Sequence, residues 1–341
     1  MICGVPFVAV TRGDVVESVH AIAACAADTQ GDIALSYGDV DAPVYLRSAA
    51  KPFIAAAIVQ SGAAAHFGFD ARELAVIAAS HNGETFHVHA VRGILAKAGL
   101  GPQDLRCGAH PPSYEPAAAA LAAAGEAPSA LHNNCSGKHA GILAMCVHLG
   151  LDTATYLEPA HPAQQRILAL CARLVGKPLE DLPVGVDGCG IPVFATSLRA
   201  AARGFARVAT LVDVPDADAQ ALQTVREAMA AEPAYVGGTA RFDSALLAVT
   251  GGRIVGKAGA EGVHADALLR SGLGLVVKVI DGGKRAVPPA AIALLSELGA
   301  FAPGEAHALA EFARPAVRNV AGRIVGAVEV RADTFQAVAA S

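Results

Sequence analysis

The periodicity of apolar residues changes twice along this chain, at Arg47 and again near Phe242. Before Arg47 the residues follow a strand-like alternation in short runs that end at Gly or Asp turn signals, which indicates a meander of antiparallel strands. Between the two changes the apolar spacing is helical, and Gly and Pro stand at the ends of the runs. After Phe242, β-branched runs interrupted by Gly-Gly turns indicate strands again, and a closing helix follows.

This order of elements predicts an α+β fold whose antiparallel sheet is formed by both ends of the chain. We expect a single catalytic domain over 1–341, with a sheet from about 1–46 and 242–341 and a helical region over about 47–241. The predicted helices cover 48–62, 71–80, 141–149, 163–175, 192–203, 217–231 and 288–298, and the late strands lie within 244–259 and 273–287.

Composition excludes several classes of protein. With 341 residues, of which 53% are hydrophobic, the chain can bury one large core. It contains no run of the roughly 18 unbroken apolar residues that a membrane-spanning helix needs, so we expect no membrane partner. The formal net charge is -5, without a block of Lys or Arg that could follow a phosphate backbone, so we expect no nucleic-acid partner. The first residues lack the pattern of a secretory signal, which predicts a cytoplasmic location.

Three short strings, far apart in the sequence, point to one kind of chemistry. They are SAAK at 48–51, SHN at 80–82 and KAG at 257–259. They fit S-x-x-K, S-x-N and K-x-G in the order found in serine β-lactamases and penicillin-binding proteins. Each string is weak by itself, but their order, residue types and expected elements agree. Together they favour a serine hydrolase with a fold like that of β-lactamases and penicillin-binding proteins.

Ser48 and Lys51 are the predicted nucleophile and its base. They are three residues apart, so on a helical turn they share one face and the amine can reach the hydroxyl. Pro52 is tolerated only in the first turn of a helix, which places Ser48 at the helix start beside unpaired N–H groups that could hold an oxyanion. Apolar neighbours of Lys51 are expected to lower its pKa, because desolvation favours the neutral amine.

Ser80 and Lys257 are predicted to form a second Ser–Lys pair. Ser80 follows an apolar helix and could pass a proton to a leaving amine, while Asn82 could bind a substrate carbonyl. The alternative for Ser80 is a helix C-terminal cap. Lys257 ends an apolar run, and its alternative is an exposed strand lysine. Ala258 replaces the hydroxyl residue with which penicillin-recognising enzymes hold a carboxylate, so a smaller substrate is expected.

Two cysteines in Gly-rich polar loops suggest a metal site. Seven Cys, spread from Cys3 to Cys189, do not resemble a disulfide framework. Cys135 and Cys189 could bind Zn²⁺ from two distant segments. Candidates for the third protein ligand are Lys138, His139, His132 and Asp187. Structural buried cysteines, or a nucleophilic pair of Cys135 with His139 or His132, remain alternatives.

The sequence resembles the L-asparaginase II family, the bacterial type typified by the inducible rhizobial enzyme. The resemblance rests on RSAAKPF, ASHNGE, HNNCSGKHAG and VDGCGIP, followed by ARFDSALLA and KAGAEGV, and it covers nearly the whole chain. It implies a serine-dependent, β-lactamase-like fold, hydrolysis of L-asparagine to L-aspartate and ammonia, and a homodimer. It also implies two Ser–Lys pairs, Ser48 with Lys51 and Ser80 with Lys257, and Zn²⁺ on Cys135, Lys138 and Cys189.

The mechanism expected from these residues is acyl transfer to Ser48, with Ser80 relaying a proton to ammonia under the influence of Lys257. The metal is expected to anchor one end of the substrate together with Arg47 and Asn134. Two alternatives are a zinc amidohydrolase, in which metal-bound water attacks, and a non-catalytic amino-acid-binding protein. The choice between asparagine and glutamine depends on one methylene of pocket depth and stays open.

Overall fold

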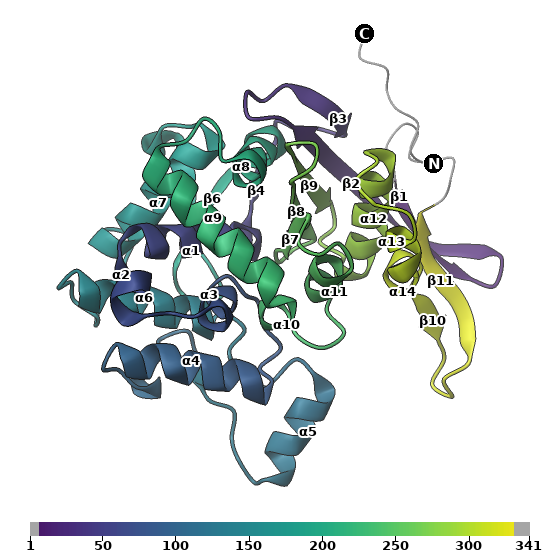
Figure 1. Cartoon of the computed structure of the whole chain (residues 1–341). Helices are drawn as coiled ribbons and strands as arrows, with labels where there is room; N and C mark the ends of the chain where they lie inside the picture. Colours follow the sequence, from purple (N-terminus) through teal and green to yellow (C-terminus); the bar gives the residue numbers. More distant parts are fainter. Residues whose placement is uncertain (1–6, 331–341) are drawn as a thin grey trace.

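The computed structural model describes residues 7–330 (Figure 1). Its large antiparallel sheet has the strand order β10-β11-β1-β2-β9-β8-β7, and β3 pairs with β2 beside this path. Three strands come from the first part of the chain and five from the last part. The predicted α+β fold, with a sheet formed by both ends, is therefore confirmed. The strands are β1 Phe7–Arg12, β2 Val15–Ala27, β3 Ile33–Tyr37, β7 Ile254–Ala258, β8 Val263–Leu268, β9 Leu273–Val279, β10 Ala316–Arg318 and β11 Ile324–Val330.

The β2 strand shows how the sheet separates two apolar layers. Successive side chains of a strand point to opposite faces. Ala23, Cys25 and Ala27 belong to the core beneath the helical region. Their neighbours Ile22, Ala24 and Ala26 belong to a second core that contains the C-terminal helix α12, Val287–Glu297. The alternation in β2 thus builds helix, sheet and helix layers in one stack.

Most helices form one body on one side of the sheet (Figure 1). The α8 helix covers β9, β8 and β2, and α7, α1 and α9 follow behind it. These and the remaining helices are α1 Lys51–Gln60, α2 Ala63–Phe67, α3 Ala71–Ile77, α4 Thr85–Lys97, α5 Glu115–Ala123, α6 Ser136–His148, α7 Pro162–Val175, α8 Leu198–Thr210, α9 Asp216–Ala231, α10 Pro233–Val236, α11 Phe242–Val249, α13 Glu305–Ala308 and α14 Ala310–Ala313. Within residues 7–330, no helix combines the length and apolar character that crossing a membrane requires.

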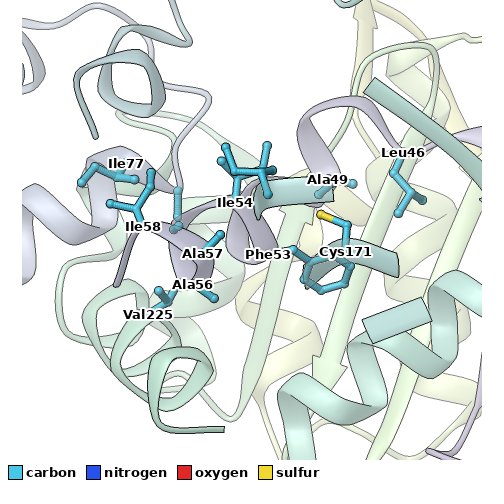
Figure 2. Packing of buried hydrophobic residues seen from close by; sticks show 14 of the residues in the cluster. Leu46, Ala49, Phe53, Ile54, Ala56, Ala57, Ile58, Ile77, Cys171 and Val225 are labelled. Carbon is cyan, nitrogen blue, oxygen red and sulfur yellow. The ribbon is translucent and has the colours of Figure 1, made fainter. Parts of the chain in front are cut away.

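The α1 helix is the centre of the helical body, with every residue from Lys51 to Ile58 buried. Figure 2 shows its small residues Ala56 and Ala57 close to Val225 of α9. Alanines at this contact let the two helix backbones approach, whereas larger side chains would overpack it. The rigid packing of α1 fixes the start of the helix, where Lys51 lies.

A close contact between α3 and α6 fixes a second part of the scaffold. A Cβ at Gly137 of α6 would lie 2.1 Å from the backbone oxygen of Val76 in α3. Only glycine allows this approach. The contact places the segment that follows α3 beside the start of α6, and these two segments carry Ser80 and Lys138 respectively.

In three predicted segments, a strand and a helix are interchanged or the strand ends early. The residues predicted to begin a helix at 192 form strand β6, Pro192–Ser197, which pairs with β4 Pro43–Tyr45 and β5 Val184–Val186 in a small separate sheet. The helix α8 begins only at Leu198. The strand predicted to begin at 244 is helix α11 until Val249, and only β7 is a strand in that range. The strand predicted over 273–287 ends at Val279, and the turn η5, Lys284–Ala286, precedes α12. Pairing partners distant in sequence decide these short segments.

Candidate active site

The two predicted serines share one cavity. It has a volume of about 410 Å³ and lies where the starts of α1 and α11 meet the end of β7. Asn134, predicted to bind substrate, also lines it, and so does Gly259 of the predicted K-x-G string. Its charged lining residues are Arg241, Asp243 and Lys284.

Ser48 lies on a 3-10 turn, η1 Arg47–Ala50, that leads directly into α1. The sequence predicted a helix from Ser48 onward, whereas the α-helix begins at Lys51, with Pro52 in its first turn as expected. Arg47 has a φ of 51°, which is uncommon for a residue other than glycine. Such a conformation persists where the surroundings hold it, and it sets the direction in which the turn leaves Arg47 and presents Ser48.

Gly259 brings the end of β7 against this turn. A Cβ at this position would lie 2.6 Å from the backbone oxygen of Leu46 and 3.3 Å from the backbone nitrogen of Ala49. A side chain would therefore push the strand away from the turn. The glycine of K-x-G permits the close approach that brings Ser48 and the β7 end into one cavity wall.

Lys51 is completely buried at the start of α1. Its Nζ lies 3.0 Å from Ser80 Oγ, 2.5 Å from the backbone oxygen of Ala79 and 3.3 Å from that of Asn134. Burial lowers the pKa of Lys51, and Lys138 lowers it too, although Cys135 opposes the shift. The structure thus brings Lys51 to Ser80, and no hydrogen bond joins it to Ser48 within the described residues.

Ser80 stands beyond the end of its helix. The α3 helix ends at Ile77 with Ala78 as its cap, so the capping alternative for Ser80 is wrong. The backbone N–H of Ser80 instead donates to Val236 in α10, over 3.1 Å. This bond fixes the segment while the hydroxyl faces both the cavity and Lys51.

Lys257 is also completely buried, which excludes an exposed strand lysine. Its Nζ lies 3.1 Å from Oδ2 of Asp243 and 2.7 Å from the backbone oxygen of Ala258. Burial lowers the pKa of Lys257 to about 8, although Asp243 opposes the shift. In the described part of the chain, the structure shows no hydrogen bond between Lys257 and Ser80. The structure therefore does not join the second predicted pair by a hydrogen bond, and Lys257 bonds to Asp243 instead.

The three predicted substrate-binding residues have different surroundings. Asn134 lines the cavity, and its side-chain amide makes no hydrogen bond to any described residue. Asn82 is buried and does not line the cavity. Its Oδ1 accepts from Ser113 and from Arg241. Arg47 pairs with Asp187, with 2.7 Å between Nε and Oδ1, and faces a smaller neighbouring cavity.

Arg241 was not predicted and has the clearest geometry for substrate binding. Its guanidinium belongs to the cavity wall and donates to Asn82 Oδ1 over 3.2 Å. Asn82 is fixed in turn, because its Nδ2 donates to the backbone oxygen of Thr239 over 2.9 Å. The asparagine of S-x-N therefore orients a cation in the cavity.

The predicted metal ligands come together from two distant segments. Lys138 Nζ lies 3.0 Å from Cys189 Sγ, and the Cys189 thiol hydrogen-bonds to Cys135. Among the other candidates, Asp187 approaches Cys189 at 3.9 Å, whereas His139 bonds to Tyr156 and His132 to Ser129. Hydrogen bonding to Cys189 lowers the pKa of Cys135. Burial alone would lower the pKa of Lys138, but the two thiols raise it.

This group of donors fits a zinc ion. Two sulfur atoms and one amine nitrogen converge in a buried site, and Zn²⁺ prefers such soft and borderline ligands. Among residues 7–330, no group of three His, Cys, Asp and Glu side chains could hold a metal, so the amine is needed to complete the set. The six cysteines in this range are all free. Cys3 lies outside the described residues.

Sequence reasoning missed Asp243, which contacts Lys257, and His264 and Asp266, which follow behind Asp243. His264 and Asp266 are two residues apart on β8, so they share one face of a strand that is otherwise apolar. Two ionisable residues at this spacing in a buried strand are a signal that could have found them. Asp243 carries no such local signal, because the packing of α11 on β7 brings it to Lys257.

Similarity to known proteins is limited at the level of single sequences and solved structures. No curated protein matches the chain in sequence. Among solved structures, native Mglu is 17% identical with a TM-score of 0.43, and the match covers 82% of this chain and 65% of Mglu. A β-lactamase from Mycobacterium bovis is 15% identical with a TM-score of 0.40, over 81% of this chain and 94% of the β-lactamase. Both TM-scores are low, and neither likeness carries an argument about function.

The present chain thus spans about 65% of the length of Mglu. A sequence profile, in contrast, covers nearly all of the described residues. The profile of L-asparaginase II matches residues 8–330, and the chain belongs to the L-asparaginase II family.

Proposed function

We propose that the protein is an L-asparaginase that hydrolyses L-asparagine to L-aspartate and ammonia through an acyl-enzyme on Ser48. One observation carries the proposal. A fully buried amine, Lys51, lies 3.0 Å from the hydroxyl of Ser80 in the wall of a cavity that also contains Ser48. The family supports an amidohydrolase, and a buried amine bonded to one serine hydroxyl, in the same cavity as a second serine, suits acyl transfer.

The surroundings of Lys51 suit a neutral amine. An NH₂ group has two N–H donors and one lone pair. The backbone oxygens of Ala79 and Asn134 can accept the two donors, and the Ser80 hydroxyl can donate to the lone pair. Every position on the nitrogen then has a partner without a positive charge, and burial lowers the pKa of the amine in the same direction. Lys51 is therefore suited to act as a base.

The proposed reaction moves one proton through this group. The Ser48 hydroxyl attacks the side-chain amide carbon of asparagine, and the proton of Ser48 passes to Lys51 by way of Ser80, whose hydroxyl is bonded to the amine. The protonated amine then supplies a proton, by way of Ser80, to the departing nitrogen, which leaves as ammonia. Water then attacks the aspartyl ester on Ser48, with Lys51 again as the base. The proton returns to Ser48 as aspartate leaves.

Backbone N–H groups are available for the oxyanion. Ala260 lines the cavity directly after Gly259, and its N–H makes no hydrogen bond to any described residue. The start of η1 contributes further N–H groups beside Ser48. Fixed donors at this place stabilise a tetrahedral intermediate more than its planar precursor.

The polar ends of the substrate need two kinds of partner. The Arg241 guanidinium is suited to the α-carboxylate, because Asn82 holds it in the cavity wall. The unbonded side-chain amide of Asn134 is suited to a second polar group of the substrate. Cys135, Lys138 and Cys189 would hold Zn²⁺, which supplies a fixed positive charge for anchoring the substrate when it is bound. A homodimer and a cytoplasmic location stay predictions from the sequence.

The decisive experiment measures ammonia release from asparagine and trapping of an ester on Ser48. Purified protein is given L-asparagine, L-glutamine and N-acetyl-asparagine in turn. We expect rapid ammonia release from asparagine and an aspartyl adduct on the peptide containing Ser48, detected by mass spectrometry after acid quench. Full activity of Ser48→Ala would overturn the acyl-enzyme, and no ammonia from any of the substrates would overturn the amidohydrolase.

A further inference from the structure

Behind Lys257 lies a buried group of ionisable side chains that the proposed reaction does not use. The Lys257 amine contacts Oδ2 of Asp243. The other oxygen of Asp243, Oδ1, lies 3.8 Å from Nδ1 of His264, and Nε2 of His264 lies 2.9 Å from Oδ1 of Asp266. All four side chains are at most 2% exposed. They form a row, Lys257–Asp243–His264–Asp266, of which only Asp243 lines the cavity.

Charge balance indicates that this row works as a unit. A buried charge is costly unless an opposite charge is paired with it. Two carboxylates and one ammonium would leave one negative charge uncompensated, whereas an imidazolium at His264 makes the row neutral. Burial opposes that proton, but Asp266 and Asp243 raise the pKa of His264. His264 therefore lies between the two carboxylates, with a hydrogen bond from Nε2 to Asp266 and an electrostatic contact from Nδ1 to Asp243 at 3.8 Å.

Two residues shape the surroundings of the His264 imidazole. Gly256 on β7 lies opposite Asp266 on β8. A Cβ at Gly256 would be 2.6 Å from Oδ1 of Asp266 and 3.1 Å from Nε2 of His264. The ring of Phe242 covers the imidazole, with 5.1 Å between ring centroids. Gly256 thus leaves room for the contact between His264 and Asp266, and Phe242 shields the imidazole from water.

We propose that His264 and Asp266 are positioning residues that hold the Asp243 carboxylate between β7 and β8 and, through it, fix the Lys257 amine at the end of β7, next to the cavity that contains the two serines. The inference rests on the proposed function for its link to turnover. Neither residue lines the cavity, so neither touches substrate. Their effect reaches the reaction only through Asp243, which has one oxygen toward Lys257 and the other toward His264.

The charged groups around His264 give the direction of the expected effect. They are Asp266 on β8, Asp243 at the start of α11 and Lys257 on β7. Lys51 and Arg241 act on Lys257 from the cavity side and lower its pKa. Without the imidazolium, Asp243 gives its whole negative charge to Lys257, so the pKa of Lys257 rises above its value of about 8.

The test compares His264→Gln, Asp266→Asn and the double variant by two readouts. In the Ser48→Ala background, ¹³Cε-lysine NMR follows the titration of Lys257, with its signal assigned by its loss in Lys257→Met. In the active protein, kcat and KM for asparagine are measured against pH. His20→Gln is the matched control, because His20 pairs with Asp281 on the same sheet but away from Lys257.

We expect the Lys257 titration to move upward by about one pH unit in His264→Gln, on the order of the effect of one neighbouring charge. Turnover should fall roughly tenfold while KM changes less than about twofold, the pattern of a group acting on the transition state alone. Asp266→Asn should move the titration in the same direction, and the double variant should match His264→Gln, because Asp266 acts only through His264.

Three results would overturn the inference. They are an unmoved Lys257 titration, a double variant in which the two shifts add, and an equal shift in the His20→Gln control. Asp266→Asn keeps the size of the side chain, so it carries the test if His264→Gln fails to fold. If the NMR shift occurs in a protein that releases no ammonia from asparagine, the proposed function fails while the positioning of Lys257 stands.

Discussion

The two buried lysines of the site have opposite kinds of partner. Lys51, at the start of α1, faces two backbone oxygens and the hydroxyl of Ser80. Lys257, on β7, faces the carboxylate of Asp243 and one backbone oxygen. Both side chains are completely buried, so desolvation acts on both. The difference lies in the charge of the acceptors.

That difference assigns the two amines different work. Neutral acceptors can satisfy a neutral amine, and a hydroxyl can donate to its lone pair, so Lys51 is suited to accept a proton. A carboxylate favours the ammonium form. Lys257 is therefore suited to supply positive charge behind the cavity wall that Ala258 and Gly259 form. In the proposed reaction, two residues of one type serve as base and as cation because the fold gives them different neighbours.

Removal of Ser48 has the largest expected effect. Ser48→Ala deletes the attacking oxygen, and loss of a nucleophile that acts in concert with its base typically lowers kcat by about 10⁴-fold or more. The measurement is steady-state ammonia release, with circular dichroism to verify folding. Retained activity in this variant, together with complete loss on chelation, would instead support the zinc amidohydrolase in which metal-bound water attacks.

The comparison of the two lysines is sharpened by replacing each with methionine, which keeps a similar length without the charge. Lys51→Met removes the base and should lower kcat by about 10³-fold, whereas Lys257→Met removes only a cation and should cost roughly 10- to 100-fold. Rates are compared at a pH where wild type is fastest. Equal losses, or a larger loss for Lys257→Met, would show that the acceptors do not assign the roles as argued.

Local spacing and periodicity explain what could be predicted from the sequence. The strands β1, β2 and β3 and the helices α1, α7 and α9 follow from apolar periodicity within one segment. The predictions were wrong for segments whose structure depends on partners distant in sequence. The β6 strand pairs with β4 and β5, and the α11 helix packs against β7.

The same distinction applies to the site. Ser48 and Lys51 are readable because three residues separate them, and Pro52 marks the start of the helix. The contact of Lys51 with Ser80, and that of Lys257 with Asp243, join residues 29 and 14 positions apart. Only the packing of α3 beside α1, and of α11 on β7, creates these contacts, so no local pattern contains them.

The thiol cluster offers a test on the Lys51 side of the site. Cys189→Ser removes one donor of the proposed zinc group and should lower bound zinc, measured by elemental mass spectrometry. If the metal anchors the substrate, KM should rise by about tenfold, equivalent to about 1.4 kcal/mol, with a smaller change in kcat. Cys146→Ser, which alters a buried cysteine elsewhere on α6, is the control. A fall in kcat with unchanged KM would contradict an anchoring role.

The last prediction concerns stability rather than turnover, and it isolates the Lys257 side. Burial lowers the pKa of Lys257 to about 8 in the folded protein, below the 10.5 of an ordinary lysine. Between these values the unfolded chain binds more protons, so this group makes stability rise with pH. The free energy of unfolding of wild type minus that of Lys257→Met should therefore increase by about 2 kcal/mol from about pH 7.5 to about pH 9.5, measured by urea denaturation. Lys177→Met, at an exposed lysine, gives the baseline. A flat difference would mean that Lys257 keeps its charge over this range, and the two buried lysines would then differ still more than the structure implies.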